Sequence, residues 1–90
     1  MKIYLIVGDT GEYEDYAKFN SAAFKDKNEA IIYMEKLNKQ LTDLGISLTP
    51  YFMHLEKSIK DISTIEDPKL KEYWIGCYGV EYSIEEMEVI

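Results

Sequence analysis

The chain has 90 residues, 47% of them hydrophobic and 13% aromatic, and a formal net charge of −7 from 17 acidic and 10 basic residues. This length predicts a single domain over residues 1–90. The negative charge disfavours direct binding to nucleic-acid phosphates and favours docking on a basic protein surface. We expect no membrane span, because no stretch approaches the roughly 20 apolar residues that a spanning helix needs.

One cysteine and one histidine limit the chemistry that the chain can perform. Cys77 has no second thiol for an intramolecular disulfide, and Cys77 and His54 are too few for a zinc cage. Neither lies in a motif that supplies a partner base or an activating cation. We therefore expect a protein that is not an enzyme and that uses no cofactor or metal. The start of the chain does not read as a signal peptide, which predicts a cytoplasmic protein with a reduced Cys77.

Two β-strands are predicted in the first quarter of the chain. Residues 2–7 (KIYLIV) form a short β-branched and aromatic run that ends at Gly8. This run is apolar on both faces, which is typical of a central or covered strand. Residues 18–24 (KFNSAAF) predict a second strand, paired with the first as a hairpin across an acidic loop.

The segment 27–44 has the clearest helical pattern. Asp26 is a good N-cap, Glu29 completes a capping-box pattern, and Gly45 is the expected stop after the last helical turn. Apolar residues at steps of three and four predict one buried face. These residues are Ala30, Tyr33, Met34, Leu37, Leu41 and Leu44.

Two further helices are predicted from proline positions. Thr49 and Pro50 are typical of a cap and a first helical position, which indicates a helix over 50–61. Asp67 and Pro68 repeat the same arrangement and predict a short helical turn.

The C-terminal segment predicts the last strand. Residues 80–84 alternate between apolar and polar side chains, but Glu85 and Glu86 break the period by one residue. We expect a β-bulge at Glu85–Glu86, which would return Met87 and Val89 to the core side.

The predicted fold class is α+β. Its order is β-β-α-α-β, with a small, mainly antiparallel sheet of three strands. The helix at 27–44 packs on one face of this sheet, and the extra helix lies in an insertion over 46–74.

Clustered acids and tyrosines are the strongest candidate for a binding surface. The loop GDTGEYEDY places two tyrosines among four acids, and a second acidic stretch lies in the last strand. Rigid aromatic rings make good binding anchors, and carboxylates orient and accelerate encounters with cationic partners. A solvated loop is the simpler alternative, and the acids do not have the spacing of a calcium loop. The predicted partner-binding residues are Glu12, Tyr13, Glu14, Asp15, Tyr16, Glu81, Glu85 and Glu86.

Three segments resemble short proteins from phages and prophages of low-GC bacteria. They are the opening MKIYLIVGDTGEYEDY, the segment AFKDKNEAIIYMEKLN and the terminal IEEMEVI. The resemblance covers residues 1–44 and about 78–90 and leaves 46–74 as an insertion. It implies no activity, but small acidic phage proteins often bind and block a host protein. By this resemblance we expect a phage-encoded inhibitor of a host defence or nucleic-acid-processing protein that has a basic surface.

Two other function classes remain open from the sequence. A small-molecule binder, such as a sequestrant of a nucleotide signal, would need cations near a pocket, for which Lys18, Lys25 and Lys27 are the local candidates. A self-associating structural protein, possible as a homodimer, could use an open strand edge or the apolar cluster at Trp74–Tyr78.

Overall fold

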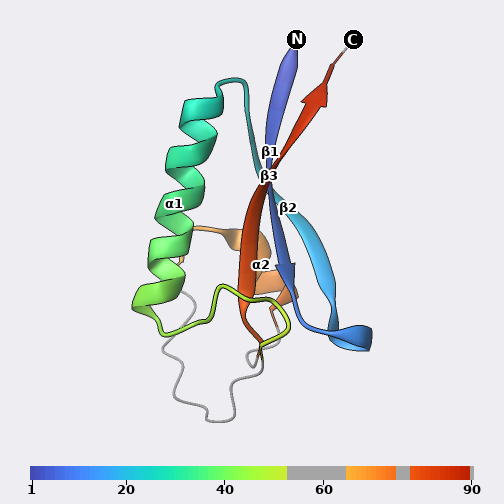
Figure 1. Ribbon diagram of the computed structural model, residues 1–90, viewed down its shortest axis with the longest axis vertical. Helices are drawn as coiled ribbons and strands as arrows, with labels where there is room; N and C mark the ends of the chain where they lie inside the picture. The colour runs from blue at the N-terminus through green and yellow to red at the C-terminus, as the bar shows by residue number, and fades with distance from the viewer. Residues whose placement is uncertain (53–64, 75–77, 90) are drawn as a thin grey trace.

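The computed structural model describes residues 1–52, 65–74 and 78–89 (Figure 1). Within these ranges a three-stranded antiparallel sheet in the order β2-β1-β3 packs against helices. This confirms the predicted α+β class. The elements are β1 (Lys2–Thr10), a 3-10 turn (Tyr13–Asp15), β2 (Ala17–Phe24), α1 (Lys27–Asp43), α2 (Pro68–Tyr73) and β3 (Val80–Glu88).

Part of the predicted insertion cannot be compared with the structure. The expected helix at 50–61 falls mainly outside the described residues, as do His54 and Cys77. Its first two residues, Pro50 and Tyr51, form a turn. No helix in the described ranges is both long and apolar enough to cross a membrane.

β1 is the central strand, as its apolar sequence predicts. Its even-numbered residues face α1, and its odd-numbered residues point to the opposite side of the sheet, because strand side chains alternate. The core fills the α1 side with residues from both edge strands and both helices. Its buried members are Ile6, Phe19, Ala30, Leu37, Leu41, Ile46, Ile65, Leu70, Val80 and Tyr82.

The ends of α1 follow the predicted capping chemistry. The Asp26 carboxylate accepts a hydrogen bond of 2.8 Å from the backbone N–H of Asn28. Gly45 has a φ of +79°, and the N–H of Ile46 donates to the carbonyl of Leu41 at 2.9 Å. This Schellman ending turns the chain back so that Ile46, only 3% exposed, enters the core beside Leu41.

The pairing of β3 with β1 corrects one prediction. It runs without a shift from Lys2 opposite Glu88 to Thr10 opposite Val80, so the bulge predicted at Glu85–Glu86 is wrong. The two glutamates therefore point to opposite faces of the sheet.

The unbroken register also changes the position of the last apolar residues. Glu86 lies on the α1 side near the end of the sheet, where its carboxylate pairs with Lys2 at 3.2 Å. Met87 lies opposite Ile3, on the face away from α1, and is 48% exposed. Val89, two residues further, is 40% exposed. Neither residue returns to the core side.

The sheet does contain a bulge, but in β2. The pairing with β1 shifts by one residue between Ile6 and Val7, which leaves Ser21 as the extra residue. Phe19 and Phe24 are five positions apart, so regular alternation would place them on opposite faces. The extra residue lets both rings point toward α1 and the core.

Aromatic packing and one buried carboxylate hold α2 on the sheet. The ring of Phe19 stacks on Tyr73 of α2, with centroids 5.5 Å apart, and meets the edge of Tyr82 at 6.3 Å. Asp67, fully buried, accepts hydrogen bonds from the N–H of Lys69 at 2.9 Å and from the hydroxyl of Tyr82 at 2.7 Å. Burial and the bond to Asp67 raise the pKa of Tyr82 far above its ordinary value. The Asp67 cap, predicted from sequence, therefore also joins α2 to β3.

We expect Tyr82→Phe to lower the free energy of unfolding by about 1–3 kcal/mol, because a buried oxygen of Asp67 loses its donor. Tyr51→Phe is the matched control, since Tyr51 is 65% exposed. Urea unfolding followed by circular dichroism measures both variants. Equal stability of the two would contradict the structural role of the Tyr82–Asp67 hydrogen bond.

A second prediction concerns the close approach of Phe19 to Gly8. A β-carbon at Gly8 would lie 2.3 Å from Cζ of Phe19. Gly8→Ala should therefore lower the free energy of unfolding by about 1–3 kcal/mol through overpacking. Phe19→Leu should cost less in the Gly8→Ala background than in the wild type, because the smaller side chain relieves the clash. Denaturation of the four proteins measures this coupling, and purely additive losses would count against it.

Candidate protein-binding surface

The acidic loop joins β1 to β2 at the end of the sheet opposite the two termini (Figure 1). The N–H of Gly11 donates to the carbonyl of Pro50 at 2.9 Å, which ties the loop to the segment after α1. The loop then makes its 3-10 turn, and the N–H of Tyr16 donates to the carbonyl of Tyr13 at 3.1 Å. The first hydrogen bond thus anchors the start of the loop, and the second closes the turn within it.

Tyr13 is the least conventional residue of the loop. Its φ is +52°, in the left-handed region that bulky residues rarely adopt, at a cost of about 1–3 kcal/mol. Its side chain is 89% exposed, so no burial of the ring offsets this cost. Glu12 and Glu14 flank it, and together with Tyr78 the three residues line an open hollow of about 700 Å³. The loop therefore presents an aromatic ring to solvent between two carboxylates.

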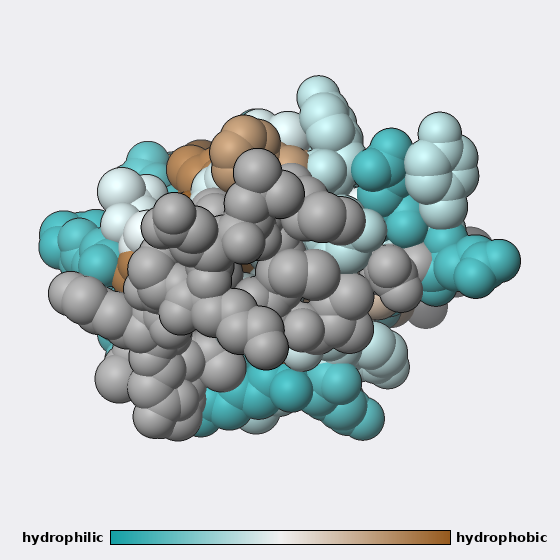
Figure 2. Space-filling model, turned by 90° about the horizontal axis from the view of Figure 1, so that it is seen from below, coloured by the Kyte–Doolittle hydropathy of each residue, from teal (hydrophilic) through white to brown (hydrophobic). Residues whose placement is uncertain are grey.

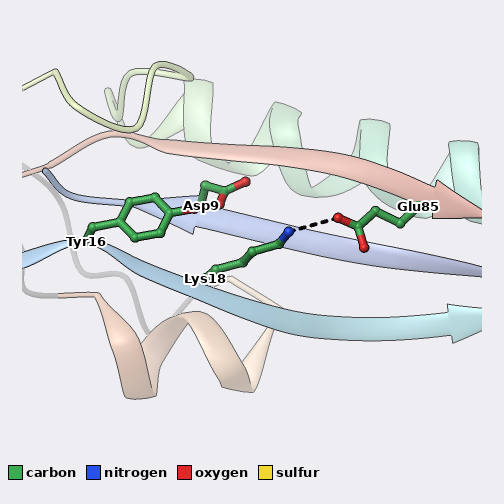
Figure 3. Close-up of polar contacts among 4 residues, drawn as sticks. All are labelled: Asp9, Tyr16, Lys18 and Glu85. Atoms are coloured by element: carbon green, nitrogen blue, oxygen red, sulfur yellow. Dashed lines mark hydrogen bonds and ion pairs between the residues drawn. The ribbon is translucent and has the colours of Figure 1, made fainter. Parts of the chain in front are cut away.

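A second group of polar side chains crosses the face of the sheet that α1 does not cover, called here the open face (Figure 3). The hydroxyl of Tyr16 donates to Oδ1 of Asp9, and Nζ of Lys18 donates to Oε1 of Glu85 at 2.9 Å. The first contact joins the loop to β1, and the second joins β2 to β3 across β1. Figure 3 shows all four side chains on the same side of the strands.

These contacts change the protonation equilibria of two groups. The hydrogen bond to the Asp9 carboxylate raises the pKa of Tyr16, because it stabilises the neutral phenol and a phenolate would face a negative charge. The Glu85 carboxylate raises the pKa of Lys18, because it stabilises the ammonium form. Lys18 is thus held as a cation by a neighbour that neutralises it.

The structure brings together some of the predicted site residues and separates others. Glu12, Tyr13 and Glu14 share the exposed loop, and the backbone of Asp15 completes its turn. Glu81 and Glu85 lie on the open face, where Glu81 is opposite Asp9.

Glu86 is not part of this surface, because strand alternation places it on the other side of the sheet. The two acidic stretches of the sequence therefore meet only in part. The predicted site also omits Asp9 and Lys18, although these two residues face each other across the β1–β2 hairpin. Once the hairpin is predicted, their opposite charges are a signal for this pairing.

The lysines of the described residues are mostly neutralised by nearby acids, whereas the loop is not. Five pairs have N···O distances within 4 Å: Lys2–Glu86, Lys18–Glu85, Lys36–Glu66, Lys39–Asp43 and Lys69–Glu72. Within the part of the chain that the structure describes, no lysine pairs with Glu12, Glu14 or Glu81. No described lysine therefore neutralises the carboxylates of Glu12, Glu14 and Glu81.

The cations proposed for a nucleotide site do not converge. Lys18 lies near the start of β2, while Lys25 and Lys27 follow its end, about 23 Å away at the usual rise per strand residue. A hollow of about 300 Å³ is lined by Lys18, Lys69, Asn20 and two aromatic rings. Both of its lysines already pair with glutamates. This arrangement favours a protein partner over an anionic small molecule.

Among the described residues, no three histidine, cysteine, aspartate or glutamate side chains are grouped to hold a metal ion. No protein-family model, curated protein or solved structure matches the chain.

We expect Asp9→Asn to lower the pKa of Tyr16 toward 10.0, because the amide no longer penalises the phenolate. Glu12→Gln is the matched control, since it removes one loop charge without touching the hydrogen bond. Titration of the tyrosine Cζ resonances by ¹³C NMR measures both variants. A shift of equal size in the two would assign the raised pKa to the general negative charge instead of to the Asp9 contact.

Proposed function

We propose that this protein is a non-enzymatic binding factor that grips a basic protein surface through its acidic, tyrosine-bearing loop. The observation that carries the proposal is Tyr13, which combines 89% exposure with a left-handed backbone. A solvent-exposed ring on a strained backbone contributes nothing to the core. A contact with another molecule is therefore the best physical reason for this conformation. Exposed tyrosines are also frequent anchors of protein interfaces.

The charge distribution supports a cationic partner. The net charge is −7, and Glu12 and Glu14 flank the tyrosine without a lysine partner among the described residues. Figure 2, which views the molecule from the loop end, shows mainly hydrophilic residues at the rim of the described surface, with brown atoms confined to a small area. Such a surface accelerates encounter with positive groups and loses affinity as salt is added.

The resemblance to phage proteins suggests what the partner would be. A phage-encoded binding factor of this kind would block a host defence protein or a nucleic-acid-processing enzyme. Both classes present basic grooves for phosphate backbones, and clustered carboxylates can occupy such a groove in place of nucleic acid.

Affinity capture from host lysate, with the intact protein as bait, tests the proposal. We expect a basic protein to bind the wild type and to be lost with Tyr13→Ala and Tyr16→Ala combined. The matched control is Ile32→Ala, which truncates a residue of α1 that is 65% exposed. Titration calorimetry with the captured protein should show at least a tenfold loss of affinity for the double variant, or about 1.4 kcal/mol or more.

The charges of the loop can be tested separately. Glu12→Lys with Glu14→Lys should weaken binding more than Glu29→Lys with Glu35→Lys on α1, although the net charge changes equally. Unaltered binding by the tyrosine double variant, with its fold intact by circular dichroism, would remove the loop from the account. Turnover of any substrate by the pure protein would contradict the non-enzymatic proposal.

A further inference from the structure

The open face of the sheet carries an apolar strip that no described segment covers. Ile3 and Leu5 of β1 point to this side, and both described helices pack against the other side. In the neighbouring strand, Met87 lies opposite Ile3 and extends the strip. Central strands that are apolar on both faces are typical of sheets covered on both faces. In the part of the chain that the structure describes, helices cover only one face of this sheet.

The strip has a polar boundary. Figure 3 shows the Lys18–Glu85 ion pair on this face. Lys18 lies opposite Asp9 and Glu85 lies opposite Leu5, so the pair crosses the central strand at the level of Val7. Val7 is only 1% exposed. Beyond the ion pair, toward the termini, the face offers Ile3 and Leu5, half-buried, beside Met87 and Val89, which are 48% and 40% exposed.

The acids on this face indicate the chemistry of the occupant. Asp9, Glu81 and Glu85 all lie on it, and within the three described strands its one lysine, Lys18, is already paired with Glu85. A second copy of the chain, with a charge of −7, would bring a matching set of acids against them. A complementary occupant carries apolar side chains flanked by lysine or arginine.

We propose that the open face is a docking surface for a protein segment that alternates apolar and cationic residues, with the apolar side chains on the Ile3–Leu5–Met87–Val89 strip. This inference rests on the proposed function and extends it. The acidic loop and the open face are continuous through Tyr16 and Asp9, so one basic partner contacts both. The apolar contact adds affinity that salt does not screen, because hydrophobic burial does not depend on charge.

The test uses the full chain, labelled with ¹⁵N, and three synthetic eight-residue probe peptides. One alternates lysine and leucine, one lysine and serine, and one glutamate and leucine. Of the three peptides, we expect only the lysine–leucine peptide to bind tightly. Its binding should shift the amide resonances of Ile3, Leu5 and Met87. Met87→Ser with Val89→Ser should weaken its binding at least tenfold. Both positions are exposed, so the variant should fold.

The matched control is Ile32→Ser with Leu48→Ser, which changes two exposed apolar side chains, 65% and 42% exposed, elsewhere on the molecule. It should bind the lysine–leucine peptide as the wild type does. Equal binding of the lysine–serine peptide would overturn the inference, since charge alone would then suffice. A dimer detected by sedimentation and lost in Met87→Ser with Val89→Ser would also overturn it, in favour of a second copy.

The outcomes separate this inference from the proposed function. If lysine–leucine binding persists in Met87→Ser with Val89→Ser but is lost in Tyr13→Ala with Tyr16→Ala, the open-face site is wrong and the loop remains the binding element. If no cationic peptide binds the wild type while a basic protein is still captured through the loop, the open-face inference fails and the proposed function stands.

Discussion

The continuous pairing of β3 with β1 determines how this small protein divides its residues between a core and a surface. From Lys2–Glu88 to Thr10–Val80, each residue of β1 has one partner in β3. Because side chains alternate along both strands, a shift by one position would move every residue to the wrong face. The register places Val80 and Tyr82 against the helices and leaves Glu81 and Glu85 on the open side.

The two faces are stabilised by different physical means. On the helix side, apolar packing predominates, and the Tyr82–Asp67 hydrogen bond fixes α2 where a six-residue helix has little stability of its own. On the open side, cross-strand polar contacts such as Lys18–Glu85 lie at the surface, where an ion pair contributes little stability. Substitution of Lys18 or Glu85 should therefore change the stability of the fold little.

Several elements were predictable because their signals are local. Asp26, Gly45 and Asp67 each satisfy a helix end through residues that are adjacent in sequence, and the periodicity of α1 identifies its buried face. The pairing of β1 with β2 follows from their proximity along the chain. These features require no knowledge of distant contacts.

The position of the bulge was not predicted, because two signals compete. Glu85 and Glu86 break the alternation, which in sequence resembles a bulge, but Glu86 lies near the sheet end where Lys2 pairs with it. The informative signal was the five-residue spacing of Phe19 and Phe24, which two core-facing rings can satisfy only with an extra residue between them.

The grouping of side chains in the loop was predictable from the sequence, but the grouping on the sheet was not. The tyrosines and acids of residues 12–16 are adjacent in sequence, and the side chain of Tyr13 is exposed. The strand register places Glu81 and Glu85 on the open face and Glu86 on the other face. It also brings Asp9 and Lys18 together on the open face. The break in alternation at Glu85–Glu86 indicated a different register, so the sequence did not predict this grouping.

The side of the sheet occupied by Met87 tests the central claim most directly. NOESY spectra of the intact protein report which methyl groups and rings lie within about 5 Å of the Met87 methyl, the spacing of directly opposed cross-strand side chains. The unbroken register predicts cross-peaks from this methyl to Ile3 and Leu5. Cross-peaks to the ring of Tyr4 instead would place Met87 on the helix side and would contradict both the register and the surface derived from it.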